Sequence, residues 1–131
     1  MFNGGIVTIY VNDMDRSVKF YTEQLGLPLL QRYENHFATI DAGHGLTIGL
    51  HPASGAAATG ERKNGISIGL YLTGSIKDAV RTLQGRGVAF AGEVIGQGKA
   101  GAFAHFSDPD GHALYIAEMK PEYRNEAVGV R

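Results

Sequence analysis

The stretch Phe103–Met119, FAHFSDPDGHALYIAEM, decides how the rest of the chain is interpreted. Residues 102–106 form an apolar-rich run with the composition of a strand, and residues 112–119 form a second such run. The DPDG segment at residues 108–111 separates them and has the composition of a tight turn. Its proline fixes φ at about −65°, and its glycine tolerates a left-handed backbone. The stretch therefore predicts a β-hairpin.

Side chains alternate between the two faces of a strand, so the last strand of this hairpin has two unlike surfaces. Leu114 and Ile116 point to one face, which we expect to pack against a helix. Ala113, Tyr115 and Ala117 point to the other face, which we expect to line a cavity with the tyrosine at its centre.

The composition fits one domain or two small repeated modules, and it excludes several classes of function. The chain has 131 residues, no cysteine and a formal net charge of −1. The absence of cysteine excludes a disulfide framework, a thiolate metal site and a cysteine nucleophile. Charges are scattered and no apolar run approaches the ~20 residues of a membrane span, so we expect no nucleic acid and no membrane as partners. The N-terminus lacks the segments of a secretion signal, and we expect a cytoplasmic protein.

The first half of the chain predicts a β-α-β-β-β series. Its expected elements are a strand at residues 6–11, a helix at 14–25 and strands at 28–33, 36–41 and 46–51. Asp13 or Asp15 is expected to cap the helix, and Gly26 to end it in a left-handed conformation. The Gly-His-Gly segment at residues 43–45 is expected to form the turn between the last two strands.

The second half repeats this series. It predicts a strand at residues 66–72, a helix from a cap at Ser75 to about Gly85, a strand at 88–95 and then the closing hairpin. When Gly26 is aligned with Gly87, the alternating apolar residues of the two opening strands coincide, which identifies an internal repeat. Neither half alone covers both faces of its sheet, so the two halves are expected to share one structure.

Two segments carry a resemblance to a known family: VTIYVNDMDRSVKFYTEQLGL at residues 7–27 and FSDPDGHALYIAE at residues 106–118. Residues 5–119 resemble the vicinal oxygen chelate (VOC) superfamily, the glyoxalase, bleomycin resistance protein and dioxygenase group. The resemblance implies an α+β fold of two βαβββ modules that curl around a central cleft, usually in a homodimer. It implies a fold more than an activity, because one fold hosts many chemistries.

The repeat and the resemblance together predict the domain organisation. Residues 1–131 are expected to form a single VOC domain. Its parts are module 1 at residues 5–51, a connector at 52–65, module 2 at 66–119 and a C-terminal tail at 120–131.

The resemblance also implies where a metal would bind. Enzymes of this superfamily place ligands before the first strand, in the fourth strand of a module, at the start of the second module and in the final strand. The matching positions here are Ile6, Thr47 or Gly49, residues 65–71 without histidine or acid, and Tyr115. None of them supplies the carboxylate or imidazole that divalent metals prefer. We therefore expect no metal site and no cofactor.

Strand parity selects the residues expected to face the cleft. His51, His105 and Tyr115 are the candidate catalytic residues, because imidazole transfers protons near neutral pH and a phenol can donate a hydrogen bond to a developing oxyanion. The candidate ligand-binding residues are Thr8, Tyr10, Thr47, Ser67, Tyr71 and Phe103. This lining holds no acid, which favours a neutral or weakly anionic organic ligand. His112 is expected on the opposite face, as a surface or packing residue.

Two functions remain open at this point. The first is a metal-independent protein of the bleomycin resistance kind, which binds a small molecule. The second is a VOC enzyme of the lyase, isomerase or dioxygenase-like kind. Such an enzyme would use His51 and His105 for metal-free acid–base chemistry or hold a metal at a displaced site. The expected partners are a small-molecule ligand and a second copy of the chain.

Overall fold

The computed structural model describes residues 1, 5–53, 66–95 and 101–119. The chain forms two compact units: residues up to 64 together with 108–112, and residues 65–107 together with those from 113 onward. The predicted tail at 120–131 and all but the first two residues of the predicted connector lie outside the described part of the chain.

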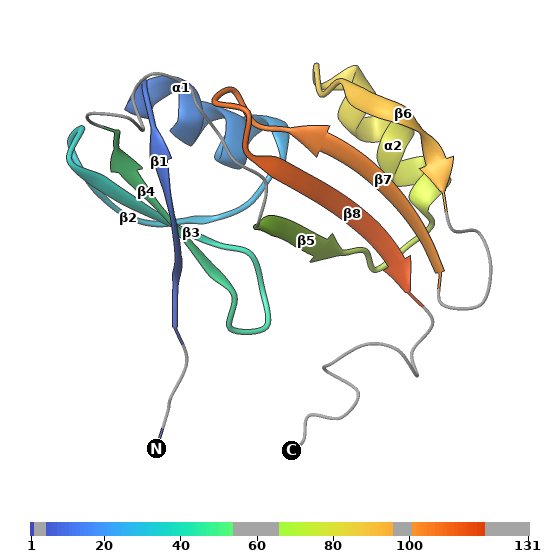
Figure 1. Ribbon diagram of the computed structural model, residues 1–131, viewed down its shortest axis with the longest axis horizontal. Coiled ribbons are helices and arrows are strands. Elements are labelled where there is room, and N and C mark those ends of the chain that lie inside the picture. The colour runs from blue at the N-terminus through green and yellow to red at the C-terminus, as the bar shows by residue number, and fades with distance from the viewer. Residues whose placement is uncertain (2–4, 54–65, 96–100, 120–131) are drawn as a thin grey trace. The chain divides into compact units, whose positions relative to one another are not determined.

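The first unit is a four-stranded sheet with one helical segment on it (Figure 1). Its elements are β1 (Val7–Val11), α1 (Met14–Lys19), the π-helix η1 (Phe20–Gln24), β2 (Leu29–Tyr33), β3 (Phe37–Asp41) and β4 (Thr47–Pro52). The strand order is β1-β4-β3-β2, with β1 and β4 parallel and the other pairs antiparallel. The predicted turn at residues 43–45 is confirmed, since all three residues take positive φ, between 47° and 90°.

The helical segment of this unit differs from the predicted regular helix over residues 14–25. Asp13 caps α1 by accepting a hydrogen bond from the Arg16 amide, but the last turn is a π-helix in which the Leu25 amide bonds the Phe20 carbonyl at 2.9 Å. The side chains of Phe20 and Tyr21, both in this turn, are buried. Gly26 ends the segment with φ at 80°, as predicted.

The second unit has the same plan (Figure 1). Its elements are β5 (Ser67–Tyr71), α2 (Ile76–Gly85), β6 (Phe90–Ile95), β7 (Gly101–Ser107) and β8 (Ala113–Met119), in the sheet order β5-β8-β7-β6. Ser75 caps α2 by accepting from the Asp78 amide, and the Glu118 carboxylate accepts from the Ile76 amide. The predicted α+β fold of two βαβββ modules is confirmed.

One face of each sheet holds the core. In the first unit Val11, Ile48 and Leu50 are buried, and α1 packs against β4. In the second unit Leu114 and Ile116 are buried, and α2 packs against β7 and β8. The opposite face of each sheet carries the residues that parity assigned to a ligand site.

Candidate functional site

An aromatic group occupies the open face of the second sheet. Tyr115 on β8 lies opposite His105 on β7, with ring centroids 5.6 Å apart and planes inclined at 48°. Phe103, also on β7, lies 6.0 Å from the same tyrosine ring at an interplanar angle of 69°. We name this set of three rings, Phe103, His105 and Tyr115, the ring cluster. Aromatic pairs prefer such inclined arrangements to a face-to-face sandwich.

A glycine on the neighbouring strand makes room for the central ring. Gly69 on β5 is the register partner of Tyr115. A Cβ atom built at Gly69 would overlap the far end of the Tyr115 ring, including its hydroxyl. The tyrosine therefore leans across β5, over the position where any other residue would place a side chain.

The open face of the first sheet has a smaller aromatic pair. Tyr10 on β1 and His51 on β4 are register partners, and their ring centroids lie 5.8 Å apart in an edge-to-face arrangement. The His51 Nδ1 atom lies 3.2 Å from the Pro52 carbonyl, a hydrogen bond that requires the proton on Nδ1. In that tautomer Nε2 is the nitrogen that accepts a proton.

The remaining predicted site residues lie on the same two open faces without joining a ring pair. Thr8 is exposed opposite Gly49, and Thr47 is half-buried opposite Asp41. Ser67 and Tyr71 are exposed at the two ends of β5. The structure thus gathers the predicted site into two groups, one on each unit. A single cleft lined by both groups remains a prediction.

The positions that would hold a metal in the superfamily do not fit one in this chain. Gly49 and Ile6 come together, since a Cβ built at Gly49 would lie 2.9 Å from the Ile6 Cδ1 atom. An aliphatic side chain thus fills the space beside the glycine. In the second unit the corresponding residues are Ser67 and Tyr115. Among the residues that the structure describes, no three histidine or acidic side chains are grouped so that they could hold a metal ion.

Sequence reasoning missed a buried polar cluster around Asp108. This carboxylate accepts hydrogen bonds from the Tyr21 hydroxyl at 2.8 Å, from the His112 Nδ1 at 2.7 Å and from the backbone amides of Asp110 and His112. Burial by itself raises the pKa of Asp108, but the hydrogen bonds and charge of His112 and the Tyr21 hydroxyl outweigh it, so the pKa lies below its usual range. Burial, followed by the charge of Asp108, raises the pKa of Tyr21 far above its ordinary value. His112, expected only as a surface or packing residue, is therefore a specific partner of this carboxylate.

Asp110, from the same turn, is bound to the start of the helical segment. Its side chain is fully buried and accepts hydrogen bonds from the Asn12 amide at 3.0 Å and the Ser17 hydroxyl at 3.2 Å. The Arg16 guanidinium lies 3.6 Å from it. The only sequence signal for these contacts was the pair of acids in a turn. Their partners lie more than 85 residues earlier, so no local pattern identified them.

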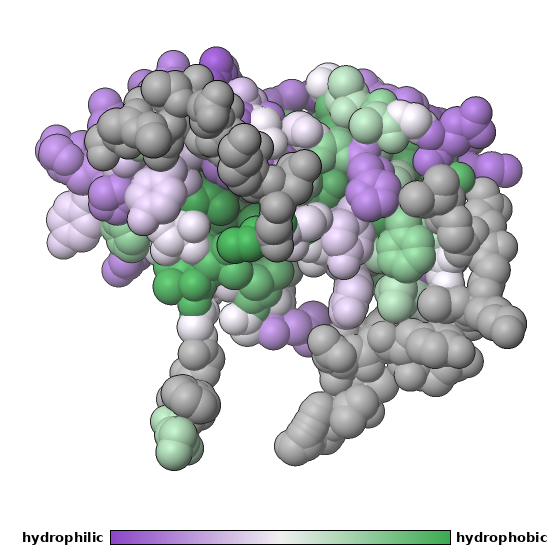
Figure 2. Space-filling model, viewed as in Figure 1, coloured by the Kyte–Doolittle hydropathy of each residue, from purple (hydrophilic) through white to green (hydrophobic). Residues whose placement is uncertain are grey.

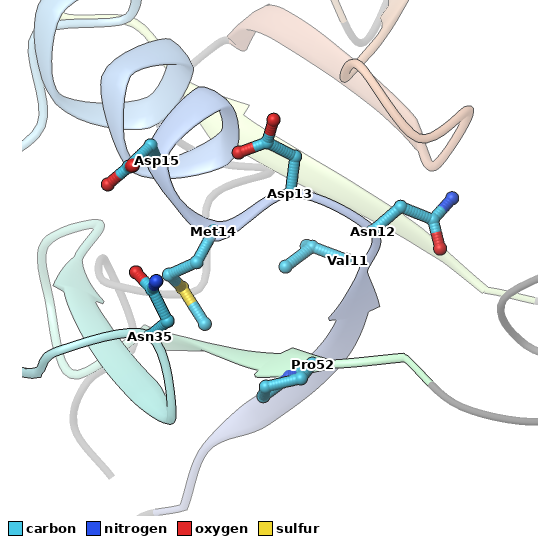
Figure 3. Close-up of a pocket in the computed structure, with 7 residues that line it drawn as sticks. All are labelled: Val11, Asn12, Asp13, Met14, Asp15, Asn35 and Pro52. Atoms are coloured by element: carbon cyan, nitrogen blue, oxygen red, sulfur yellow. The ribbon is translucent and has the colours of Figure 1, made fainter.

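A surface pocket of about 300 Å³ lies where β1 leads into α1 (Figure 3). It is lined by Val11, Asn12, Asp13, Met14, Asp15, Asn35 and Pro52. Its two carboxylates have partners elsewhere, because Asp13 caps α1 and Asp15 pairs with Arg32 at 2.6 Å. The pocket was not predicted, and it contains none of the predicted site residues.

Part of the exposed surface of the first unit is apolar. In Figure 2 hydrophobic side chains gather beside β1, where Ile6 is 49% exposed. Among the described residues, every buried side-chain nitrogen and oxygen has a hydrogen-bond partner. None of the helices in the described ranges combines the length and the apolar character needed to cross a membrane.

Comparisons with solved structures agree with this fold. An antibiotic binding protein from Streptomyces sp. CB03234, TnmS3, is 22% identical, with a TM-score of 0.69 and coverage of 92% of this chain and 98% of its own. A glyoxalase family protein from Bacillus anthracis is 13% identical, with a TM-score of 0.72 and coverage of 92% and 97%. These two likenesses establish the fold alone.

A superfamily member from Sphaerobacter thermophilus is 28% identical, with a TM-score of 0.68 and coverage of 90% of this chain and 98% of its own. A search of curated proteins found no match. The profile of the Glyoxalase/Bleomycin resistance protein/Dioxygenase superfamily matches residues 5–116, most of the chain. The chain therefore belongs to the Glyoxalase/Bleomycin resistance protein/Dioxygenase superfamily.

Proposed function

We propose that this protein binds a small neutral or weakly anionic organic molecule, without a metal, at the open faces of its two sheets. The observation that carries the proposal is the ring cluster of Phe103, His105 and Tyr115. Ligand sites are lined mainly by apolar and aromatic groups, with a few polar atoms that fix orientation. The cluster supplies two aromatic surfaces, an imidazole and a phenol hydroxyl within one small area.

The charge of the surrounding face supports the same ligand class. Parity places Ser67, Gly69 and Tyr71 of β5 on the face of the ring cluster, together with residues 101, 103, 105 and 107 of β7 and 113, 115, 117 and 119 of β8. Along these three described strands, His105 is the only side chain of the face that can carry a positive charge, and none carries a carboxylate. These three strands offer a strongly cationic ligand no carboxylate, and the fourth strand of the sheet, β6, adds one exposed acid, Glu93.

The structural neighbours favour binding as a function of this fold. TnmS3 is by its name an antibiotic binding protein, and this chain shares its fold over nearly the whole of both chains. We propose for this chain, as for TnmS3, the binding of a small molecule, but not the same ligand. The site residues Thr8, Tyr10, Thr47, Ser67, Tyr71 and Phe103 are proposed to contact the ligand.

A thermal-shift screen of neutral and weakly anionic organic molecules tests this function. A molecule present at one hundred times its dissociation constant is expected to add about 2.7 kcal/mol to the free energy of unfolding. His105→Ala and His51→Ala are expected to weaken the hits, whereas His36→Ala, at an exposed position outside both ring groups, is expected to leave them unchanged. The proposal would be contradicted by a screen without hits, or by hits that bind both site variants as tightly as they bind the wild type.

A second candidate function is metal-free acid–base catalysis by His51 or His105 with Tyr115, in a lyase- or isomerase-like reaction. The observation in its favour is that each imidazole lies within 6 Å of a tyrosine ring. An imidazole exchanges protons near neutral pH, and a phenol can stabilise negative charge on a bound molecule. Chemical analysis of each screening hit after incubation separates the functions, because a binder returns its ligand unchanged.

Elemental analysis of the purified protein tests the metal-independent part of both functions. Stoichiometric zinc, nickel, manganese or iron would mean that ligands have moved to a displaced site. The homodimer, the cytoplasmic location and the domain boundaries are likewise proposals. Sedimentation at several concentrations tests the first of them.

A further inference from the structure

We propose that Gly69 is a specificity-determining residue, because it fixes Tyr115 in a position that selects planar aromatic molecules. This inference rests on the proposed binding function and names the class of ligand. It is independent of the buried Asp108 cluster.

Tyr115 is held in place by the strand pairing that sets it beside Gly69. Gly69 and Tyr115 are partners in the parallel pairing of β5 with β8, and the end of the ring lies where a side chain at residue 69 would begin. Any residue with a Cβ atom would force the ring away from β5. The glycine is not required by its own backbone, because its φ lies outside the left-handed region. Its small size is therefore explained by the ring that it accommodates.

The position of Tyr115 sets the angles among the three rings of the ring cluster. With Tyr115 held over β5, its ring is inclined at 69° to Phe103 and at 48° to His105. Two rings at a steep angle form a corner. A planar molecule stacked on one ring then meets the other ring edge-on, and both arrangements are favourable between aromatic groups. A saturated molecule of the same outline gains only from burial.

In the part of the first unit that the structure describes, the equivalent place holds no aromatic ring beside its glycine. By register, the Thr8–Gly49 pair corresponds to the Gly69–Tyr115 pair, so the glycine lies on β4 in the first unit and on β5 in the second. In the first unit the space over the glycine is occupied by Ile6, which is aliphatic. The corner of rings thus belongs to the second unit, and we place the planar part of the ligand there.

The test uses 2-naphthol as a planar probe and decahydro-2-naphthol as its saturated counterpart, both titrated calorimetrically into the full chain. We expect 2-naphthol to bind roughly three- to tenfold more tightly than the saturated probe. Gly69→Ala is expected to remove that preference, as is Tyr115→Ala. The double variant should be no weaker than Tyr115→Ala, because both changes act through one ring. Gly74→Ala, in the same unit with nothing within 4 Å of its added Cβ, is the matched control.

Gly69→Ala is expected to fold, since the atoms it displaces are the far end of the Tyr115 side chain and not backbone atoms. Circular dichroism and the unfolding midpoint verify this. Equal binding of the two probes, or a full preference retained in Gly69→Ala, would overturn the inference. The inference also fails if 2-naphthol does not bind while other molecules of the thermal-shift screen do, and the proposed function then stands. If no molecule of the screen binds, the proposed function itself is wrong.

Discussion

The two sheets share one topology, and the pairings of β4 and β8 with their neighbours share one register, but the sheets differ in their outer strand pairs and side chains. The first unit places a short aromatic pair, Tyr10 and His51, on its open face, and the second places the ring cluster there. The turns before the last strand differ more. Residues 43–45 are a glycine-rich turn with a single side-chain contact, from Asp41 to the Gly43 amide. Residues 108–112 carry two buried carboxylates. The two units thus share a backbone topology, while the side chains at equivalent positions differ. We therefore expect the two units to contribute unequally to stability and to ligand binding.

The largest expected effect comes from removing Asp108, the buried carboxylate of the second turn. Removing Asp41, the half-buried carboxylate just before the first turn, serves as the comparison. Asp108→Ala leaves the Tyr21 hydroxyl, the His112 ring and two amides without their acceptor, and we expect a loss of about 3–5 kcal/mol in the free energy of unfolding. Asp41→Ala removes one contact, and we expect about 1 kcal/mol. Urea unfolding measures both. Equal losses would show that the two turns are energetically equivalent.

The next largest expected effect on stability comes from removing one hydrogen-bond donor to Asp108, the Tyr21 hydroxyl. Tyr21→Phe keeps the packing of the ring but removes the hydroxyl that bonds Asp108 at 2.8 Å. We expect a loss of about 1–3 kcal/mol, because the carboxylate stays buried with one donor fewer. Tyr33→Phe is the control, since Tyr33 is 68% exposed, and it should change stability by less than about 0.5 kcal/mol. A negligible effect at Tyr21 would mean that water replaces the hydroxyl.

The pH dependence of stability tests the contribution of the ionised Asp108 in the second turn. The pKa of Asp108 is lowered in the folded state, so its ionised form stabilises the fold above the unfolded pKa of about 4. That contribution is lost as the pH falls through the lower, folded-state pKa. We expect the stability difference between wild type and Asp108→Asn to shrink from pH 6 to pH 2.5. A difference that stays constant over this range would contradict the assigned shift.

The smallest expected effect compares the helix starts. Asp13 and Ser75 each accept one amide hydrogen bond at the first turn, from Arg16 and Asp78 respectively. Replacing either with alanine should cost about 1 kcal/mol. Thermal unfolding of both variants measures the difference. A loss at Asp13 more than twice that at Ser75 would assign the pocket-lining aspartate a further role.

Much of the fold followed from patterns within short windows. Period-two alternation located the strands, and the burial of Leu114 and Ile116 agrees with the predicted faces. The helix caps at Asp13 and Ser75 and the left-handed Gly26 followed from residue types with local preferences. These features depend on neighbours within four residues, which a single sequence displays directly.

Most of the features that were missed depend on partners far away in the chain, although the missed Asp108–His112 contact spans only four residues. The Asp108–Tyr21 contact spans 87 residues, and the apolar pattern of residues 14–25 did not distinguish a π-helical last turn from a regular helix. The place of Tyr115 was predicted by parity, but the role of Gly69 was not, since it depends on the register between β5 and β8. The pocket beside Asp13 and Asn35 is lined by the start of a helix and by a turn that are separate in the sequence, and no sequence motif predicted it.

The turn that carries Asp108 and Asp110 joins two strands of the second unit, although its own contacts belong to the first. The ribosome therefore completes the strands and helix of the first unit well before it supplies their last hydrogen-bond acceptors. At roughly 5–20 residues per second, synthesis of residues 54–108 takes on the order of 3–10 s. During that interval the Tyr21 hydroxyl lacks the acceptor that it has in the finished fold. We expect a nascent chain arrested near residue 90 to be digested readily by proteases, and one extended at its C-terminus by a linker, so that residue 112 has left the ribosomal tunnel, to be resistant.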